Sequence, residues 1–235
     1  MLRREIISAQ KRNNPGFSSN DSLFYLDGLS VDFNGKLALD SIQLKVERGE
    51  ILFVTGPSGA GKTTLLKVLS GDLKPTEGRL LTPDPSRHFC TTVYQDLKLE
   101  PSLSCEANLS IAYDPSIYKN KKEFEKEVSE LTSYFSIEDS LGLKIKDCNG
   151  GLKQKIAIIR ALLSRPDILL ADEPTSSLDQ RNSEKLFEVL SYYNSKRKMT
   201  VIWASHNRNL VGQFSGRIVH MDNGKMIYSG HACFI

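Results

Sequence analysis

The stretch Gly56-Pro57-Ser58-Gly59-Ala60-Gly61-Lys62-Thr63-Thr64 decides the fold. The segment Ile51-Leu52-Phe53-Val54 precedes it and is apolar throughout, which predicts a buried strand. The segment 64–69 follows it and is apolar on one helical face. A G-x-x-x-x-G-K-T pattern between a strand and a helix is the context that a phosphate-binding loop requires. The alternative, a chance glycine-rich turn, does not account for the two flanks.

The residues of this stretch suit the β- and γ-phosphates of a nucleotide. Glycines let backbone N–H groups approach phosphate without a Cβ clash, and a helix N-terminus adds partial positive charge. Lys62 would reach the phosphates, and the Thr63 hydroxyl would bind Mg²⁺. We therefore expect the nucleotide to contact Gly56, Pro57, Ser58, Gly59, Ala60, Gly61, Lys62, Thr63 and Thr64.

The composition bounds the class of protein. The 235 residues fit one large domain or two small lobes, and the 40% hydrophobic fraction can fill a core. The net charge of +3 comes without a basic cluster long enough for nucleic acid, so we expect no nucleic-acid partner. Four scattered cysteines predict neither a disulfide scaffold nor a zinc site, which fits a reducing cytoplasm. No run of 18 apolar residues occurs, so we expect no membrane span, and the basic N-terminus lacks an apolar core behind it, so we expect no secretory signal.

Residues 1–22 are polar and precede the folded domain, which we place at 23–235. They predict a loose tail with a short helix over 2–11, or alternatively a basic arm that touches lipid headgroups. Alternation then predicts strands over 26–33 and 39–46, with a turn at Asn34-Gly35.

The segment 96–147 differs from the rest, because it carries 7 Lys/Arg and 11 Asp/Glu. Apolar residues at helical spacing within 119–135 (Phe124, Val128, Leu131 and Phe135) predict a small helical lobe. We interpret the charge run KNKKEFEKEVSE in this lobe as a solvated helix face.

The C-terminal half alternates helices and strands. We expect helices over 152–163 and 184–194, strands over 168–173 and 200–206, and a hairpin over 217–228. This order predicts an α/β fold with a mostly parallel sheet, beside an antiparallel β part and the inserted helical lobe. The loop 56–64, the pair Asp172-Glu173 and His206 each follow or end a predicted strand. They therefore fall at the C-terminal ends of strands, where α/β sheets bind ligands.

Phosphoryl transfer to water needs a phosphate cradle, a metal, a base that orients water and a sensor of the γ-phosphate. Asp172 would hold Mg²⁺ through water, and Glu173 would polarise the attacking water. Gln95 would touch Mg²⁺ or that water, and His206 the γ-phosphate. Each residue alone also suits a structural or turn position; their order along the chain favours the catalytic interpretation.

At these residues the chain resembles the ATP-binding subunits of ABC transporters over 23–230. GPSGAGKTT is similar to the Walker A motif and ILLADEP (168–174) to Walker B with its catalytic glutamate. Gln95 stands at the Q-loop, SSLD (176–179) at the D-loop with Asp179, and His206 at the switch position. The resemblance implies a P-loop core, ATP and Mg²⁺ as cofactors, and 96–147 as the inserted helical subdomain. It also implies that Phe33 stacks on adenine.

The signature motif of the family departs from its usual Leu-Ser-Gly-Gly-Gln. Here it is Cys148-Asn149-Gly150-Gly151-Leu152, with Lys155 at a position where arginine is usual. Both glycines remain, and the Asn149 amide can still donate to phosphate. Leu152 cannot hydrogen-bond through its side chain. We therefore expect an ATPase with slowed turnover.

The resemblance also implies partners and a location. Two copies would sandwich two ATP molecules, each facing the other copy's Asn149–Gly151, as a homodimer in the ATP-bound state. A membrane subunit would dock near Gln95 and the helical lobe, so the ATPase would lie on the cytoplasmic face of the inner membrane. The leucines of 97–109 line that groove or form the core of the lobe.

The phrases LLADEPT and TVIWASHNRNLV look most like the branch with the cell-division ATPase FtsE and the lipoprotein-release and macrolide-efflux ATPases. No regulatory domain is expected after Gly230. Two alternatives compete with a subunit of a membrane complex. One is a soluble ABC ATPase that acts on ribosomes, DNA or cluster assembly. The other is a degenerate nucleotide-dependent scaffold, which the altered signature favours.

Overall fold

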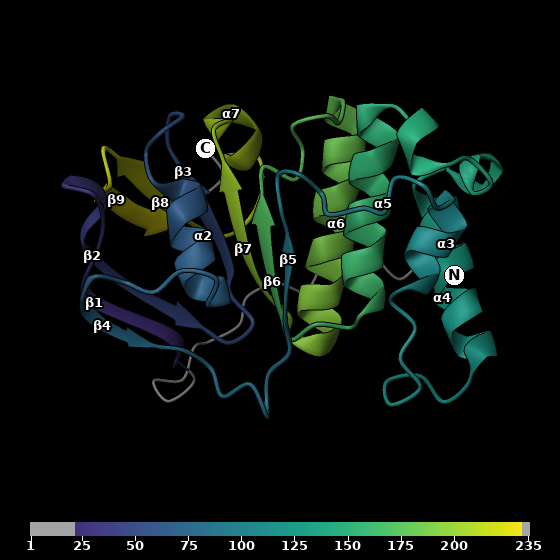
Figure 1. Cartoon of the computed structure of the whole chain (residues 1–235), viewed down its shortest axis with the longest axis horizontal. Coiled ribbons are helices and arrows are strands. Elements are labelled where there is room, and N and C mark those ends of the chain that lie inside the picture. The colour runs from purple at the N-terminus through teal and green to yellow at the C-terminus, as the bar shows by residue number, and fades with distance from the viewer. Residues whose placement is uncertain (1–21, 232–235) are drawn as a thin grey trace. The chain divides into compact units, whose positions relative to one another are not determined.

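The computed structural model describes residues 22–231 (Figure 1). The expected helix over 2–11 therefore lies outside the described residues, as does Cys233. The described chain divides into two compact units. The first unit comprises Val93–Pro166 and Pro174–Tyr193, and the second comprises 22–92, Asp167–Glu173 and 194–231.

The second unit is built on a six-stranded sheet with the order β5-β6-β7-β3-β8-β9. The edge strand β9 runs antiparallel to its neighbour β8. The strands β3, β6, β7 and β8 are parallel to one another. Every residue of β3, β6 and β7 is buried, which explains why these strands are nearly continuous apolar runs in the sequence. The bounds are β5 Cys90–Val93, β6 Ile168–Asp172, β7 Thr200–Ser205, β3 Ile51–Thr55, β8 Arg217–Asp222 and β9 Lys225–His231.

The same unit holds a three-stranded antiparallel sheet with the order β2-β1-β4. Its strands are β1 Ser22–Phe33, β2 Lys36–Glu47 and β4 Glu77–Leu81. The expected turn is confirmed, since Asn34 and Gly35 both have the positive φ of a tight hairpin. One hydrophobic core joins this sheet to the larger sheet and to α2 (Lys62–Ser70). The predicted α/β class, with parallel and antiparallel parts, is confirmed.

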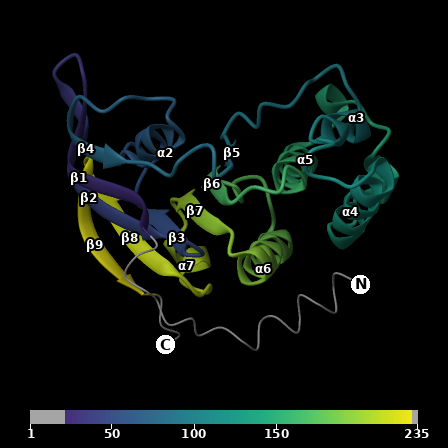
Figure 2. The ribbon, with the colours of Figure 1, turned by 90° about the horizontal axis from the view of Figure 1, so that it is seen from below.

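The first unit is helical. α3 (Cys105–Ser110) and α4 (Lys121–Tyr134) pack on α5 (Gly150–Leu163), as Figure 2 shows. The unit also contains the short turns η1 (Glu138–Ser140) and η2 (Ile145–Asp147) and most of α6 (Gln180–Arg197). It extends beyond 96–147, because α3 and α4 bury their inner faces against α5. None of the helices within 22–231 has a stretch long and apolar enough to span a bilayer.

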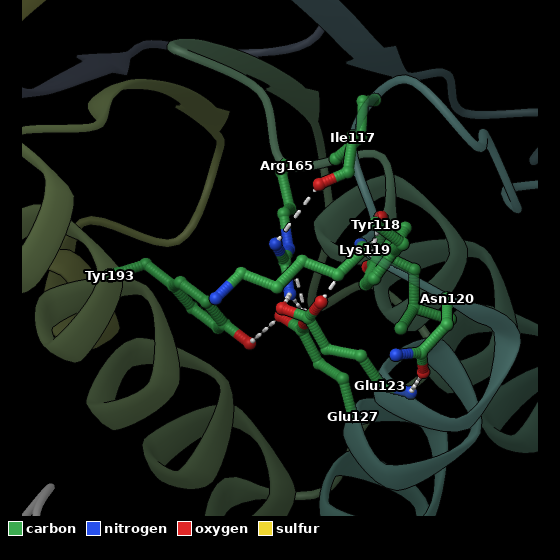
Figure 3. Close-up of polar contacts among 9 residues, drawn as sticks. Ile117, Tyr118, Lys119, Asn120, Glu123, Glu127, Arg165 and Tyr193 are labelled. Carbon is green, nitrogen blue, oxygen red and sulfur yellow. Dashed lines mark hydrogen bonds and ion pairs between the residues drawn. The ribbon is translucent and has the colours of Figure 1, made fainter.

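The solvated-face interpretation of the 119–130 charge run is wrong for one side of α4. Glu127 is buried and Glu123 half-buried, and both accept from the Arg165 Nη2, at 2.8 Å and 2.9 Å (Figure 3). The Arg165 guanidinium also lies 4.0 Å from the ring centroid of Tyr118, and the Tyr193 hydroxyl donates to Glu127 at 3.0 Å. Two glutamates four residues apart share one helix face, which here faces an arginine instead of water.

Candidate nucleotide site

The loop after β3 forms a tight cradle. A Cβ at Gly56 would lie 2.2 Å from the carbonyl oxygen of Met221, and a Cβ at Gly61 would lie 2.6 Å from that of Ala38. Neither distance is possible for a real side chain, so glycine is required at both positions. The loop backbone therefore packs directly against Met221 and Ala38, which fixes its conformation.

The positive charge of the cradle comes from Lys62, whose ammonium is buried inside the loop. It donates to the carbonyl oxygens of Gly56 at 2.8 Å and Pro57 at 2.9 Å. α2 starts at this lysine, and its N-cap residue, Gly61, supplies no side-chain acceptor. The first-turn N–H groups of a helix lack partners within the helix, so they and the ammonium together form a site for an anion.

A cation position lies beside the cradle. The Thr63 hydroxyl donates to Asp172 Oδ2 at 2.7 Å, while Asp172 Oδ1 is buried and has no hydrogen-bond partner among residues 22–231. Burial raises the pKa of Asp172, and the Thr63 hydrogen bond offsets part of that effect. A hydroxyl and an unpartnered carboxylate oxygen are the ligand type that Mg²⁺ prefers, and a cation would satisfy the orphaned oxygen. The residues present therefore fit Mg²⁺.

Glu173 and His206 meet directly. Glu173 Oε1 lies 2.9 Å from His206 Nδ1 and 3.8 Å from Lys62 Nζ. The Glu173 backbone has a φ of 51° and donates to the Ala204 carbonyl at 3.0 Å, which fixes this sparsely populated conformation. A carboxylate held between an imidazole and an ammonium group is placed to take a proton from water. Sequence reasoning placed both residues here but missed their contact.

The parallel register explains why these groups meet. Thr55, the last residue of β3, pairs with Ser205, and Asp172, the last residue of β6, pairs with Ala204. The carboxyl ends of three neighbouring strands therefore lie at one edge of the sheet. Figure 1 shows β3, β7 and β6 in this order. Phe33, the expected adenine contact, is 51% exposed at the end of β1.

The altered signature belongs to the first unit. Asn149 is the N-cap of α5, and its Oδ1 accepts from the Leu152 N–H at 2.8 Å. The cap uses only the amide oxygen of this exposed side chain, so the amide nitrogen remains a donor. A Cβ at Gly151 would lie 3.0 Å from the Ser177 carbonyl oxygen, and one at Gly150 3.2 Å from the Ser177 hydroxyl. The close packing against Ser177 was not predicted, since nothing local in the sequence indicates it.

Two other predicted residues also lie in the first unit. Gln95 is exposed. Asp179 accepts from the Asn182 N–H at 2.8 Å, and this hydrogen bond lowers the pKa of its carboxyl. The structure thus brings together Lys62, Thr63, Asp172, Glu173 and His206 within the second unit, and it describes Gln95, Asn149, Gly150, Gly151 and Asp179 within the first.

Comparisons with known proteins agree on one family. A family model described as ABC transporter matches residues 39–176. The spermidine/putrescine import ATP-binding protein PotA of Mycoplasma mycoides is 34% identical over 87% of this chain and 60% of its own length. The cell division ATP-binding protein FtsE of Bacillus subtilis is 30% identical over 83% of this chain and 90% of its own length. The chain thus spans about three fifths of the PotA relative.

Solved structures give the same result. The dimeric structure of a bacterial ABC transporter cassette has a TM-score of 0.79 and 27% identity, covering 91% of this chain and all of that one. A dimeric post-hydrolysis state of an ATP-binding cassette with ADP and Pi has a TM-score of 0.77 at the same identity and coverage.

Proposed function

Since the chain belongs to the ABC transporter family, whose cassettes hydrolyse ATP, we propose that it is an ATPase subunit that dimerises on ATP and drives a conformational change in a membrane protein. The observation that carries this proposal is the cluster in which Glu173 contacts His206 beside Lys62. A water-polarising carboxylate, a cation position and a phosphate cradle are the parts that hydrolysis of a nucleoside triphosphate requires.

Each residue of the cluster has a role in this proposal. Lys62 and the N–H groups of the loop bind the β- and γ-phosphates. Thr63 and Asp172 would hold Mg²⁺, which would neutralise charge on the phosphates. Glu173 accepts the proton of the attacking water, and His206 orients that carboxylate through the 2.9 Å contact. The role of Gln95, to touch Mg²⁺ or the attacking water, stays a prediction.

Dimerisation completes the site in this proposal. Asn149, Gly150 and Gly151 of one copy face the γ-phosphate held by the other copy, and Asp179 lies at the same interface. The dimeric state of the neighbouring cassettes supports a homodimer. Leu152 removes the side-chain hydrogen bonds that a glutamine would make at the start of α5, so we propose that turnover is slow.

The membrane partner is proposed to dock near Gln95 and the helical lobe, with the ATPase on the cytoplasmic face of the inner membrane. Leu103, Ile111 and Leu143 are large apolar side chains of the first unit that remain exposed, which supports docking there; Leu109 is fully buried and belongs to the core. The FtsE relative supports a cell-division type of complex, and the PotA relative supports transport.

The altered signature favours a second candidate, a nucleotide-dependent scaffold with weak turnover. Intact Lys62, Asp172 and Glu173 support the ATPase over this candidate. The two candidates predict different effects of losing Glu173, because the weak turnover of a scaffold would fall little, whereas the turnover of an ATPase would fall strongly.

The partner can be identified with Glu173→Gln, which should bind ATP and stall. A tagged form is expressed in its own host, membranes are solubilised with Mg-ATP, and copurifying proteins are identified. The control is the double variant Lys62→Ala/Glu173→Gln, which lacks the lysine that we expect to bind the β- and γ-phosphates. An integral protein with four spans, retained only with intact Lys62, indicates a cell-division or lipoprotein-release type of complex, and a permease with more spans indicates transport. Recovery from the soluble fraction alone would contradict a membrane subunit.

A further inference from the structure

Two cysteines of the first unit are in contact although 43 residues separate them. The Sγ atoms of Cys105 and Cys148 lie 3.5 Å apart, and both residues are buried and reduced. A disulfide needs about 2.05 Å between the sulfurs, so closing the bond requires the two Sγ atoms to approach by about 1.5 Å. Among the described residues no group of three or more His, Cys, Asp and Glu side chains could hold a metal ion, and the Cys148 thiol also donates to the Lys144 carbonyl at 3.2 Å.

The backbone holds the pair in this position. Cys105 N–H donates to the Leu143 carbonyl at 2.8 Å, and Ile145 N–H donates to the Leu103 carbonyl at 3.0 Å. Ser104 and Lys144 form an isolated antiparallel bridge between the same segments. Cys148 then follows η2, with its N–H bonded to the Ile145 carbonyl at 3.1 Å. The sulfurs are therefore close because two paired segments place them so.

Cys148 directly precedes the N-cap of α5. Its neighbour Asn149 caps the helix, and Gly150 and Gly151 form the first helical turn. A covalent bond at Cys148 would tie this start of α5 to the start of α3. We propose that Cys105 and Cys148 are a redox modification site, whose reversible disulfide restrains the Asn149–Gly151 segment and slows ATP turnover. The effect on turnover rests on the proposed function, whereas the formation of the disulfide is independent of it.

Exposure sets the order of the reaction. Cys148 is 8% exposed and Cys105 fully buried, so a small hydroperoxide reaches Cys148 first. The Cys148 sulfur attacks hydrogen peroxide, the O–O bond breaks, the thiol proton passes to the departing oxygen, and sulfenic acid and water form. The Cys105 sulfur then attacks the Cys148 sulfur and the S–O bond breaks, releasing water as the disulfide forms. Two thiols are oxidised and one peroxide is reduced. Burial raises the pKa of Cys105 to about 12, which keeps this thiol protonated before the second step.

The test uses the full chain with Cys90→Ser and Cys233→Ser, so that only the pair remains. After hydrogen peroxide treatment, peptide mapping should find a Cys105–Cys148 cross-link, and ATP turnover should fall about threefold or more and return with dithiothreitol. Cys105→Ala and Cys148→Ala, each in the same background, should form no cross-link and lose no dithiothreitol-reversible activity.

Two results would overturn the proposal. One is that Cys148 remains a thiol or is oxidised to sulfinic acid, and that no cross-link to Cys105 forms. The other is a complete cross-link that leaves turnover unchanged. A reduced protein that hydrolyses no ATP would instead contradict the proposed function, while the cross-link would still be read from the peptides.

Discussion

At the residue scale, the orphaned oxygen of Asp172 is the clearest sign of a site that awaits a cation. A buried carboxylate with one unsatisfied oxygen and a raised pKa costs folding free energy when it is ionised. The native state binds this proton more tightly than the unfolded chain does, so the cost is present above the raised pKa. Such a residue is retained for chemistry and not for stability.

Asp172→Asn should therefore separate stability from activity. The amide keeps an acceptor for the Thr63 hydroxyl and removes the buried charge, so the thermal midpoint in magnesium-free buffer should rise by about 2–4 °C. Mg-ATP turnover should fall about a hundredfold. The single Trp203 is fully buried, and its fluorescence reports the unfolding of the second unit. A lower midpoint would argue against a desolvation cost.

Leu152 carries the prediction on the altered signature. Leu152→Gln should raise turnover at saturating Mg-ATP by about tenfold or more, because the amide can hydrogen-bond at the start of α5. Leu152→Met, which stays apolar and similar in volume, is the matched control and should not change the rate. If Leu152→Gln also leaves the rate unchanged, the signature does not limit turnover.

At the scale of elements, Arg165 joins α4 to the chain just after α5. It is half-buried and pairs with Glu127 and Glu123, while Tyr118 covers its guanidinium (Figure 3). Breaking a buried pair costs more than the pair contributes, because one charge is left without its partner. Removing one partner should therefore weaken the attachment of α4, which also buries Phe124 and Leu131.

Glu127→Gln should lower the free energy of unfolding by about 2 kcal/mol, since Glu123 still offsets part of the Arg165 charge. Urea unfolding followed by circular dichroism measures the change. Glu125→Gln is the matched control on the same helix, because Glu125 is exposed and pairs with the exposed Lys121 at 3.7 Å. Equal effects of the two variants would show that the Arg165 contact does not hold α4.

Glu123 gives the pH dependence of the same contact. The Arg165 hydrogen bond lowers the pKa of Glu123 from its ordinary value of 4.5. The stabilisation is therefore complete above that value and is lost as the pH falls through the lowered pKa. Glu123→Gln should be less stable than the parent chain at neutral pH, and the difference should vanish in acid. A difference in unfolding midpoint that stays constant over a pH series would contradict this assignment.

At the scale of the whole molecule, the sequence predicts those elements and site residues that depend on a local sequence pattern. The strand before the cradle, the loop and the carboxylates at the end of β6 all follow from short periodicities and strand-end chemistry. The α/β class follows from the order of these elements. Contacts between segments that are distant in the sequence cannot be predicted in this way, because no local sequence pattern specifies which side chains will meet. Glu127 facing Arg165, Ser177 beneath the two glycines, and Cys105 beside Cys148 all belong to this group.

The central claim is that Glu173, held by His206, activates water for ATP hydrolysis. The most direct measurement compares Mg-ATP turnover of the purified chain, Glu173→Gln and Glu125→Gln, with nucleotide binding measured in parallel. We expect Glu173→Gln to lose about a hundredfold or more in turnover while it still binds ATP, and Glu125→Gln to match the parent chain. A Glu173→Gln chain that hydrolyses ATP as fast as the parent would contradict the account.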